Sequence, residues 1–540
     1  MARTRAPARS RPAAPLLALG AVVLALLLFV LAVVVWSGAS LSSDGTALAQ
    51  VGIQPFGGTL ERVRAFGPHQ RAIPLSVHGD RVTPLVKLTP GEAVTIEAVV
   101  RRPGWSSWAL GALQHERLTV HAPVARVSQE WMTVPNGSSP RVEFDQPVAA
   151  VAYGSGGHLT RRTLIAGARS ISLGPQPAAG TTLVAAAARP WERLGAPTPV
   201  SWFPASRTPI VVPSPAARSN VTPSSPIRLT FSQPVAQVLG ARRPTLTPNI
   251  AGHWRELDSH TIVFQPEGFG APLASTLHMT LPRALSIAGD GPSAGSQTPT
   301  ASLEWTVPPG STLRLQQLLA QVGYLPLRWS RAGATVPHTA AAEVAAATSP
   351  PPGRFTWRYP NTPGSMRALW SEGQMNTITK GAVMMFESEH GMTADGEAGE
   401  AVWRTLIDDA INGRRHGGGY NYVYVHREVP ESVALWHDGS TVLTAPANTG
   451  IAGAETELGT FPVFEHIPEG TMEGTNPDGS HYKDEGIKWI SYFNGGDALH
   501  NFNRASFGTP QSLGCVELPL EASAKLWHYT PIGTLVTIAA

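Results

Sequence analysis

Residues 16–36 form an uncharged run of 21 amino acids, LLALGAVVLALLLFVLAVVVW. As a helix rising about 1.5 Å per residue, the run would be about 31 Å long, enough to cross the hydrocarbon core of a bilayer. The preceding arm, residues 1–15, contains four arginines and no acid. Basic flanks stay on the cytoplasmic side, so we expect a single-pass anchor at Leu16–Trp36 with the rest of the chain outside the cell. Ala47-Leu48-Ala49 fits a signal-peptidase motif, which leaves the alternative of cleavage after Ala49 and secretion.

The composition beyond this run indicates folded, turn-rich domains. Hydrophobic residues make up 42% of the 540 residues, which excludes wholesale disorder, and 53 glycines and 49 prolines favour short strands and loops. The net charge is only +3, and the four arginines of the arm account for it. A nucleic-acid partner is therefore not expected. The chain has a single cysteine, Cys515, so no disulfide can form within it.

The region before residue 308 predicts a mainly β, multidomain protein. Residues 37–50 are small and polar and predict a linker, and residues 51–122 predict a first β module. The segment VEFDQPVAAV at 142–151 matches LTFSQPVAQV at 229–238, an offset of 87 residues. This offset is typical of one immunoglobulin-like domain. We therefore expect tandem β-sandwich modules at 123–206 and 207–308, of which the second resembles bacterial immunoglobulin-like wall domains.

Helical periodicity begins at about residue 309. Apolar residues recur at helical spacing in 313–322, 379–391 and 398–409. The pattern resembles the peptidoglycan-binding three-helix module, with an insertion at 330–372, and the resemblance implies such a module at 309–414 that binds glycan or peptide. The positions that carry it are Leu315, Gln316, Leu319, Gly323, Tyr324, Ala382, Val383, Phe386, Gly391, Met392, Asp395, Gly396, Trp403 and Leu406.

The chemistry is expected in residues 418–540, around the lone cysteine. A thiol attacks only as thiolate, and a neighbouring imidazole can supply that form by lowering the thiol's pKa. His500 ends an apolar stretch, and a strand, a loop and a return strand would bring Cys515 beside it. Gly514 would leave room for substrate, and its amide could face a developing oxyanion. The pattern predicts acyl transfer with Cys515 as nucleophile and His500 as general base and acid.

These residues resemble the YkuD-type L,D-transpeptidase catalytic domain, whose pattern is His-Gly, a loop, then Ser-His-Gly-Cys-Val/Ile-Arg/Asn. The resemblance implies a β-rich fold with a cleft under a capping loop, here 470–488. It also implies that Ser512 and Gly514 hold the shape of the motif, and it suggests substrate contacts from Ser512, Asn501, Tyr492, Trp489 and His481. Leu513 and Glu517 depart from the pattern, as does Asn501 in place of Gly.

The reaction that the resemblance implies has two steps. The thiolate takes the acyl group of a peptidoglycan tetrapeptide stem, and an amine of a neighbouring stem resolves the thioester into a 3→3 cross-link. No metal or other cofactor is expected, and carbapenem β-lactams are expected as covalent inhibitors. Two alternatives stay open: an L,D-carboxypeptidase that uses water, and a catalytically decayed wall-binding scaffold, which Leu513 and Glu517 would favour.

Two further enzyme classes lack the side chains they need. A metal-dependent peptidase needs clustered ligands, and His481-x-x-Asp484 has no second set at suitable spacing. A glycosidase needs two facing carboxylates, whereas Glu387, Glu389 and Asp395 are expected on a solvated helical surface.

Overall fold

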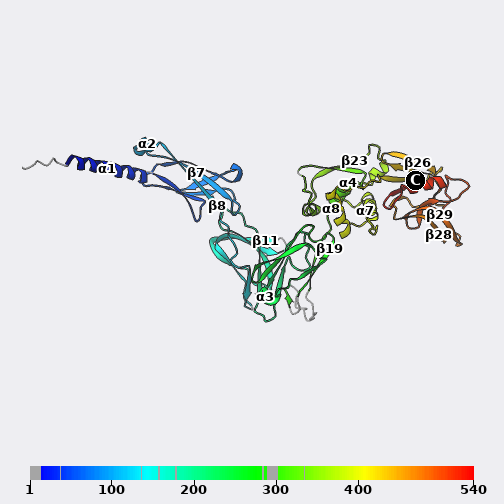
Figure 1. The fold of residues 1–540 in the computed structure, drawn as a ribbon, viewed down its shortest axis with the longest axis horizontal. Helices are drawn as coiled ribbons and strands as arrows, with labels where there is room; N and C mark the ends of the chain where they lie inside the picture. The colour runs from blue at the N-terminus through cyan, green and yellow to red at the C-terminus, as the bar shows by residue number, and fades with distance from the viewer. Residues whose placement is uncertain are drawn as a thin grey trace, which may run out of the picture. The chain divides into compact units, whose positions relative to one another are not determined.

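The structure is a computed structural model. It describes residues 14–36, 38–135, 137–155, 158–176, 179–281, 285–288, 302–333 and 335–540. The chain divides into two compact units, Met1–Val212 and Pro213–Ala540. Figure 1 follows the chain by colour from blue at the N-terminus to red at the C-terminus.

Helix α1 (Ala14–Trp36) covers the uncharged run. The predicted basic arm up to residue 13, and the side chains at 14–18 and 33–35, lie outside the described residues. Counted over the described residues, no helix meets the length and hydropathy needed to cross a membrane. The anchor at Leu16–Trp36 therefore stays a prediction.

The first β module begins earlier than predicted. Strand β1 (Ala39–Ser43) and the first two residues of β2 (Ala49–Ile53) lie in the stretch 37–50 that was assigned to a linker, and the two strands pair. Leu48, Ala49 and Val51 are buried in the core of the module. The module has two four-stranded sheets, ordered β1-β2-β6-β5 and β4-β3-β7-β8. The remaining bounds are β3 (Thr59–Phe66), η1 (Pro68–Gln70), β4 (Ala72–Ile73), β5 (Leu75–His78), β6 (Arg81–Pro84), β7 (Ala93–Arg101), α2 (Gly104–Leu110) and β8 (Leu113–His121).

The second β module differs from the predicted two-sheet sandwich. Within the described part of 123–206, the strands form one five-stranded sheet, ordered β11-β10-β12-β13-β9. Its two longest strands are 15 residues each, with register shifts that let one face cover a core containing Phe144 and Trp202. The strands are β9 (Trp131–Val134), β10 (Arg141–Ser155), β11 (His158–Ser172), β12 (Gly180–Ala187) and β13 (Thr198–Pro204).

The third β module has two sheets, ordered β17-β18-β15-β14-β20 and β16-β19-β21. Its strand β14 (Ile210–Ser214) spans the boundary between the two units. The remaining elements are β15 (Ile227–Phe231), α3 (Val235–Val238), β16 (Thr245–Thr247), β17 (Gly252–Asp258), β18 (Thr261–Pro266), β19 (Ser275–Thr280), β20 (Ser286–Ile287) and β21 (Ser302–Val307).

The helical region is larger than the predicted three helices. Helices α4 (Thr312–Val322), α7 (Thr377–Glu389) and α8 (Glu400–Asn412) lie at the expected positions, and each contacts the other two. The predicted insertion at 330–372 adds α5 (Ala340–Thr348), α6 (Gly364–Ala368) and β23 (Gly353–Trp357). Strand β23 forms a hairpin with β22 (Leu327–Arg331), most of which precedes the insertion.

Glu387 on α7 was expected on a solvated surface, and the structure places it in the interior. Its side chain is buried and accepts the Gly396 amide at 2.8 Å. Burial, opposed by this hydrogen bond and reinforced by Asp395, raises its pKa to about 7.

The C-terminal domain consists of two sheets around one apolar core. The first sheet is ordered β26-β25-β24-β32-β27, and the second β28-β29-β30-β31. In Figure 1 the second sheet and the C-terminus are orange to red. The bounds are β24 (Asn421–His426), β25 (Ser432–His437), β26 (Ser440–Pro446), β27 (Gly459–Pro462), β28 (Glu465–Thr475), β29 (His481–Asn494), β30 (Asp497–Asn501), β31 (Val516–Leu518), α9 (Leu520–Trp527) and β32 (Leu535–Ala539).

Candidate active site

Strand pairing brings His500 and Cys515 to one face of the second sheet. β30 and β31 run parallel, with Leu499 opposite Val516 and His500 opposite Glu517. Side chains alternate along each strand, so Leu499 and Val516 enter the main core. His500 and Glu517 project from the other face, and Cys515, just before β31, comes two residues ahead of Glu517. The segment between the two residues has the predicted order of strand, loop and return strand.

The Cys515 thiol rests as a neutral group. Its Sγ lies 3.6 Å from the carbonyl oxygen of Gly496, to which it donates, and it packs beside Ile490 and Ala498 in a small apolar cluster. Burial, opposed by a hydrogen bond from the Ala498 amide and reinforced by the charge of Asp497, raises the pKa of Cys515 to about 12. A thiol with this pKa is protonated at neutral pH, whereas the sequence analysis expected a neighbouring imidazole to lower the thiol's pKa.

His500 is held as a neutral base. It is 3% exposed, and its Nδ1 lies 2.9 Å from the carbonyl oxygen of Asn501. A carbonyl can only accept, so Nδ1 carries the proton and Nε2 keeps its lone pair. Burial lowers the pKa of His500, although the Asn501 carbonyl and the charge of Glu517 oppose this. The imidazole can therefore take a proton at neutral pH.

The turn before the cysteine is fixed from two sides. The Ser512 hydroxyl donates to the Cys515 carbonyl oxygen at 2.5 Å. Gly514 has φ +116°, a conformation that disfavours other residues. A Cβ at Gly514 would also lie 2.2 Å from a carboxylate oxygen of Asp497. Asp497 thus occupies the space that was expected to receive substrate, and glycine is needed for this contact.

The charge of Glu517 is balanced by Arg504. Arg504 donates to both of its carboxylate oxygens, with Nε at 2.8 Å and Nη2 at 2.6 Å. The Glu517 side chain is 5% exposed and that of Arg504 is 30% exposed. The same guanidinium donates to the Gln511 carbonyl and lies over the Phe502 ring. The charge reversal at position 517 is therefore compensated locally by a bidentate pair.

A pocket of about 850 Å³ opens over these groups. Its floor includes His500, Cys515 and the Arg504–Glu517 pair. The β28–β29 hairpin, which contains the predicted cap 470–488, forms one wall through residues such as Met472 and Tyr482. Carboxylates prevail over cations in the lining: Glu473, Asp478, Asp484, Asp497 and Glu517, against Arg504.

The pocket includes some predicted substrate contacts and omits others. Of the predicted contacts, Tyr492 and Ser512 line it; Leu513, for which no contact was predicted, also lines it. His481 is exposed at the hairpin tip, 3.3 Å from the Thr475 hydroxyl, and does not line the pocket. Trp489 packs against Trp527 and His528 instead, because its backbone adopts φ +61°. The Asn501 side chain reaches the Leu518 carbonyl, and only its backbone carbonyl serves His500.

Asp497 and Arg504 are pocket residues that the sequence analysis missed. Glu517 lies between Val516 and Leu518, two residues of the main core, and a buried carboxylate requires a cation. That signal could have led to Arg504. In the part of the chain that the structure describes, no group of three or more His, Cys, Asp or Glu could hold a metal ion.

Comparison with known proteins gives one family match. Residues 420–538 match the model of the L,D-transpeptidase catalytic domain, YkuD. Among curated proteins none matches the chain.

Three solved structures illustrate the structural likeness. An L,D-transpeptidase from Mycobacterium smegmatis is 12% identical and covers 61% of this chain and 97% of its own, with a TM-score of 0.21. L,D-transpeptidase 3 from Mycobacterium tuberculosis, in complex with a faropenem-derived adduct, has the same four values. The catalytic domain of the E. faecium L,D-transpeptidase, acylated by ertapenem, is 23% identical and covers 23% of this chain and 99% of its own, with a TM-score of 0.21. TM-scores this low support no argument by themselves.

The family match falls on the segment where sequence motif, strand pairing and pocket coincide. Residues 420–538 are therefore a YkuD-type L,D-transpeptidase catalytic domain.

Proposed function

We propose that this domain transfers the acyl group of a peptidoglycan stem peptide through a thioester on Cys515. The observation that carries the proposal is the projection of Cys515 and His500 from one sheet face into one capped pocket. Nothing else in the chain offers a thiol, since Cys515 is its only cysteine.

The acylation half begins from the neutral pair. His500 Nε2 takes the thiol proton as Sγ attacks the carbonyl carbon of the third stem residue, an L-centre. The oxyanion that forms faces the amides of Gly514 and Cys515, for which the structure records no acceptor among the described residues. The tetrahedral intermediate then collapses. The C–N bond to the terminal D-residue breaks, and its amine leaves with the proton from His500.

The second half transfers the acyl group. An uncharged acceptor amine attacks the thioester carbonyl while His500 takes its proton. The C–S bond then breaks, the 3→3 cross-link forms, and His500 returns the proton to the thiolate of Cys515. The carboxylates along the pocket wall attract a cationic amine. This excess of acid favours an amine acceptor over water, and so a transpeptidase over an L,D-carboxypeptidase.

Carbapenem acylation tests the proposal. Intact-mass measurement after incubation with a carbapenem should show one covalent adduct, because the β-lactam carbonyl takes the place of the stem carbonyl. Cys515→Ser should show none. A folded wild-type protein without an adduct would favour the scaffold alternative. Cross-linked stem dimers formed by Cys515→Ser would refute the mechanism.

We also propose that the domain works outside the cell, tethered by Leu16–Trp36. The support is the uncharged run behind an arginine-rich arm. Replacing Arg3, Arg5, Arg9 and Arg11 should impair or invert insertion, measured by protease accessibility of the C-terminal domain in intact cells. Unchanged accessibility would count against this topology.

A further inference from the structure

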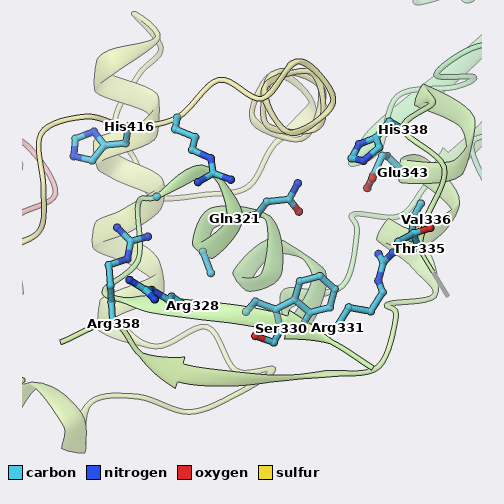
Figure 2. A pocket seen from close by; sticks show the side chains of 14 residues that line it. Gln321, Arg328, Ser330, Arg331, Thr335, Val336, His338, Glu343, Arg358 and His416 are labelled. Atoms are coloured by element: carbon cyan, nitrogen blue, oxygen red, sulfur yellow. The ribbon is translucent and has the colours of Figure 1, made fainter. Parts of the chain in front are cut away.

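The helical region contains a second large pocket, far along the sequence from the catalytic motif. It measures about 730 Å³ and is formed by the end of α4, the strand β22, the segment that follows it, and residues 415–416. Figure 2 shows Arg328 and Arg358 on one side of it, Arg331 and His338 on the other, and Gln321 between them. Most of this lining comes from the hairpin and the inserted segment rather than from the three predicted helices.

The lining is strongly basic. Four arginines contribute to it: Arg328, Arg331, Arg358 and Arg415. Among the 14 described residues that line the pocket, the one carboxylate is Glu343. That carboxylate is buried and already engaged by Arg314, a buried residue that does not line the pocket. Within the described lining, Glu343 is therefore not available to neutralise Arg328, Arg358 and Arg415.

Gathering like charges around a hollow is electrostatically unfavourable unless an anion shares the site. A guanidinium presents a planar fork of donors that matches the two oxygens of a carboxylate or phosphate. Several guanidinium groups around one cavity suit a ligand with more than one acidic group. This charge is opposite to that of the catalytic pocket, where carboxylates prevail.

The remaining lining suits an organic ligand rather than a bare ion. Two guanidinium groups lie near the Trp329 ring, with Cζ of Arg314 5.8 Å and Cζ of Arg331 5.4 Å from the ring centroid. This stacking stabilises Arg331 at the pocket wall. Ala320 and Val336 add apolar surface, and Gln321 adds a neutral hydrogen-bonding group. The volume is within the range of small-molecule sites.

We propose that this basic pocket binds an organic anion carrying two or more carboxylate or phosphate groups. The site is separate from the Cys515 pocket and goes beyond acyl transfer there. A peptide with free carboxylates and a phosphate ester share the chemistry that the arginines recognise.

Calorimetric titration of the full-length protein carrying Cys515→Ser tests the site without turnover. The probes are the free peptidoglycan stem tetrapeptide, as the carboxylate source, and fructose 1,6-bisphosphate, as the phosphate source. We expect saturable binding of at least one probe, weakened by added salt. The probe that binds more tightly identifies the source.

Charge-neutralising variants locate the binding. Arg328→Gln with Arg358→Gln should weaken it by about tenfold or more, because hydrogen bonds to charged groups are lost. Arg354→Gln is the matched control, since Arg354 is exposed on β23 of the same hairpin and does not line the pocket. If the double variant fails to fold, the same titration is done with Arg415→Gln, because Arg415 lies on an exposed segment.

Two results would overturn the site: no binding of either probe, or equal loss with Arg354→Gln and with the lining variants. Carbapenem adduct formation by the same arginine variants with Cys515 intact should be unchanged. Failure of that reaction in the wild type would count against the proposed acyl transfer and leave the anion site standing.

Discussion

At the scale of single residues, the proposed catalytic pair of Cys515 and His500 shows what burial does to a thiol. A thiolate–imidazolium pair in this place would require two desolvated charges, whose cost is several kcal/mol each. Burial instead raises the pKa of Cys515 to about 12 and lowers that of His500. Both groups are thus neutral at rest, and the proton moves only when an electrophile is present.

This resting state predicts the pH profile of acylation. His500 acts as base only when deprotonated, so the rate should rise with pH through its folded pKa. Because that pKa is lowered, the acid limb should lie below the ordinary value of about 6.5. Carbapenem acylation rates across pH measure it. A limb governed instead by a free thiol, near about pH 8.5, would contradict the neutral pair.

The Arg504–Glu517 pair predicts opposite shifts of that limb. The charge of Glu517 raises the pKa of His500 and that of Arg504 lowers it. Arg504→Gln should therefore move the acid limb up, and Glu517→Gln should move it down. Arg504→Gln should also cost roughly 3 kcal/mol of stability, because it leaves a buried carboxylate unpaired.

Urea unfolding and acylation rates of both variants and their double variant measure these effects. The double variant should recover most of the lost stability, as a coupled pair requires. Additive losses in stability would show that the two residues act independently.

The sequence was sufficient to single out Cys515, the one cysteine of the chain, and His500, 15 residues before it, which the structure places on one face of a sheet. It could not indicate their charge states, since these depend on burial. It also could not place Arg504, which lies 13 positions before Glu517, across a segment made largely of turns and loop.

At the scale of elements, helix α7 packs directly against the catalytic domain. A Cβ on Gly381, in α7, would lie 2.6 Å from the Gly533 carbonyl oxygen and 2.8 Å from the Leu535 side chain. Gly533 itself adopts φ +89° just before β32. The two glycines thus let a helix backbone approach the sheet more closely than any side chain would allow.

Gly381→Ala is therefore predicted to destabilise the protein, although alanine has a higher helix propensity than glycine. Alanine within a helix is normally favoured by about 1 kcal/mol over glycine. Here the added methyl meets backbone, which cannot move aside, so the midpoint of thermal unfolding should fall. Gly364→Ala in α6 is the control, because no atom lies within 4 Å of its Cβ position. A rise in the midpoint for Gly381→Ala would show that the contact does not form.

The elements that periodicity revealed were the helices α4, α7 and α8 and the strands around His500. The pairing of β1 with β2 was missed because a small, polar segment resembles a linker until its few apolar residues meet a core. The single sheet of the second β module was missed because a local repeat of ten residues does not determine how strands associate.

At the scale of the whole molecule, the two large pockets carry charges of opposite sign. The Cys515 pocket is rich in carboxylates, and the pocket beside β22 is rich in arginine. The overall charge of +3 conceals this division. Composition alone could therefore reveal neither site.

Both pockets, and every residue assigned to catalysis, belong to the unit Pro213–Ala540. A fragment beginning at residue 207 keeps strand β14 (Ile210–Ser214) whole. It should form the carbapenem adduct at a rate within about twofold of the full chain, since distant, independent regions contribute separately. Thermal unfolding followed by calorimetry should lose the transition of the first unit and keep that of the second. The fragment carrying Cys515→Ser is the control for the adduct. A fragment that folds but forms no carbapenem adduct would show that the catalytic site needs the β modules before residue 207.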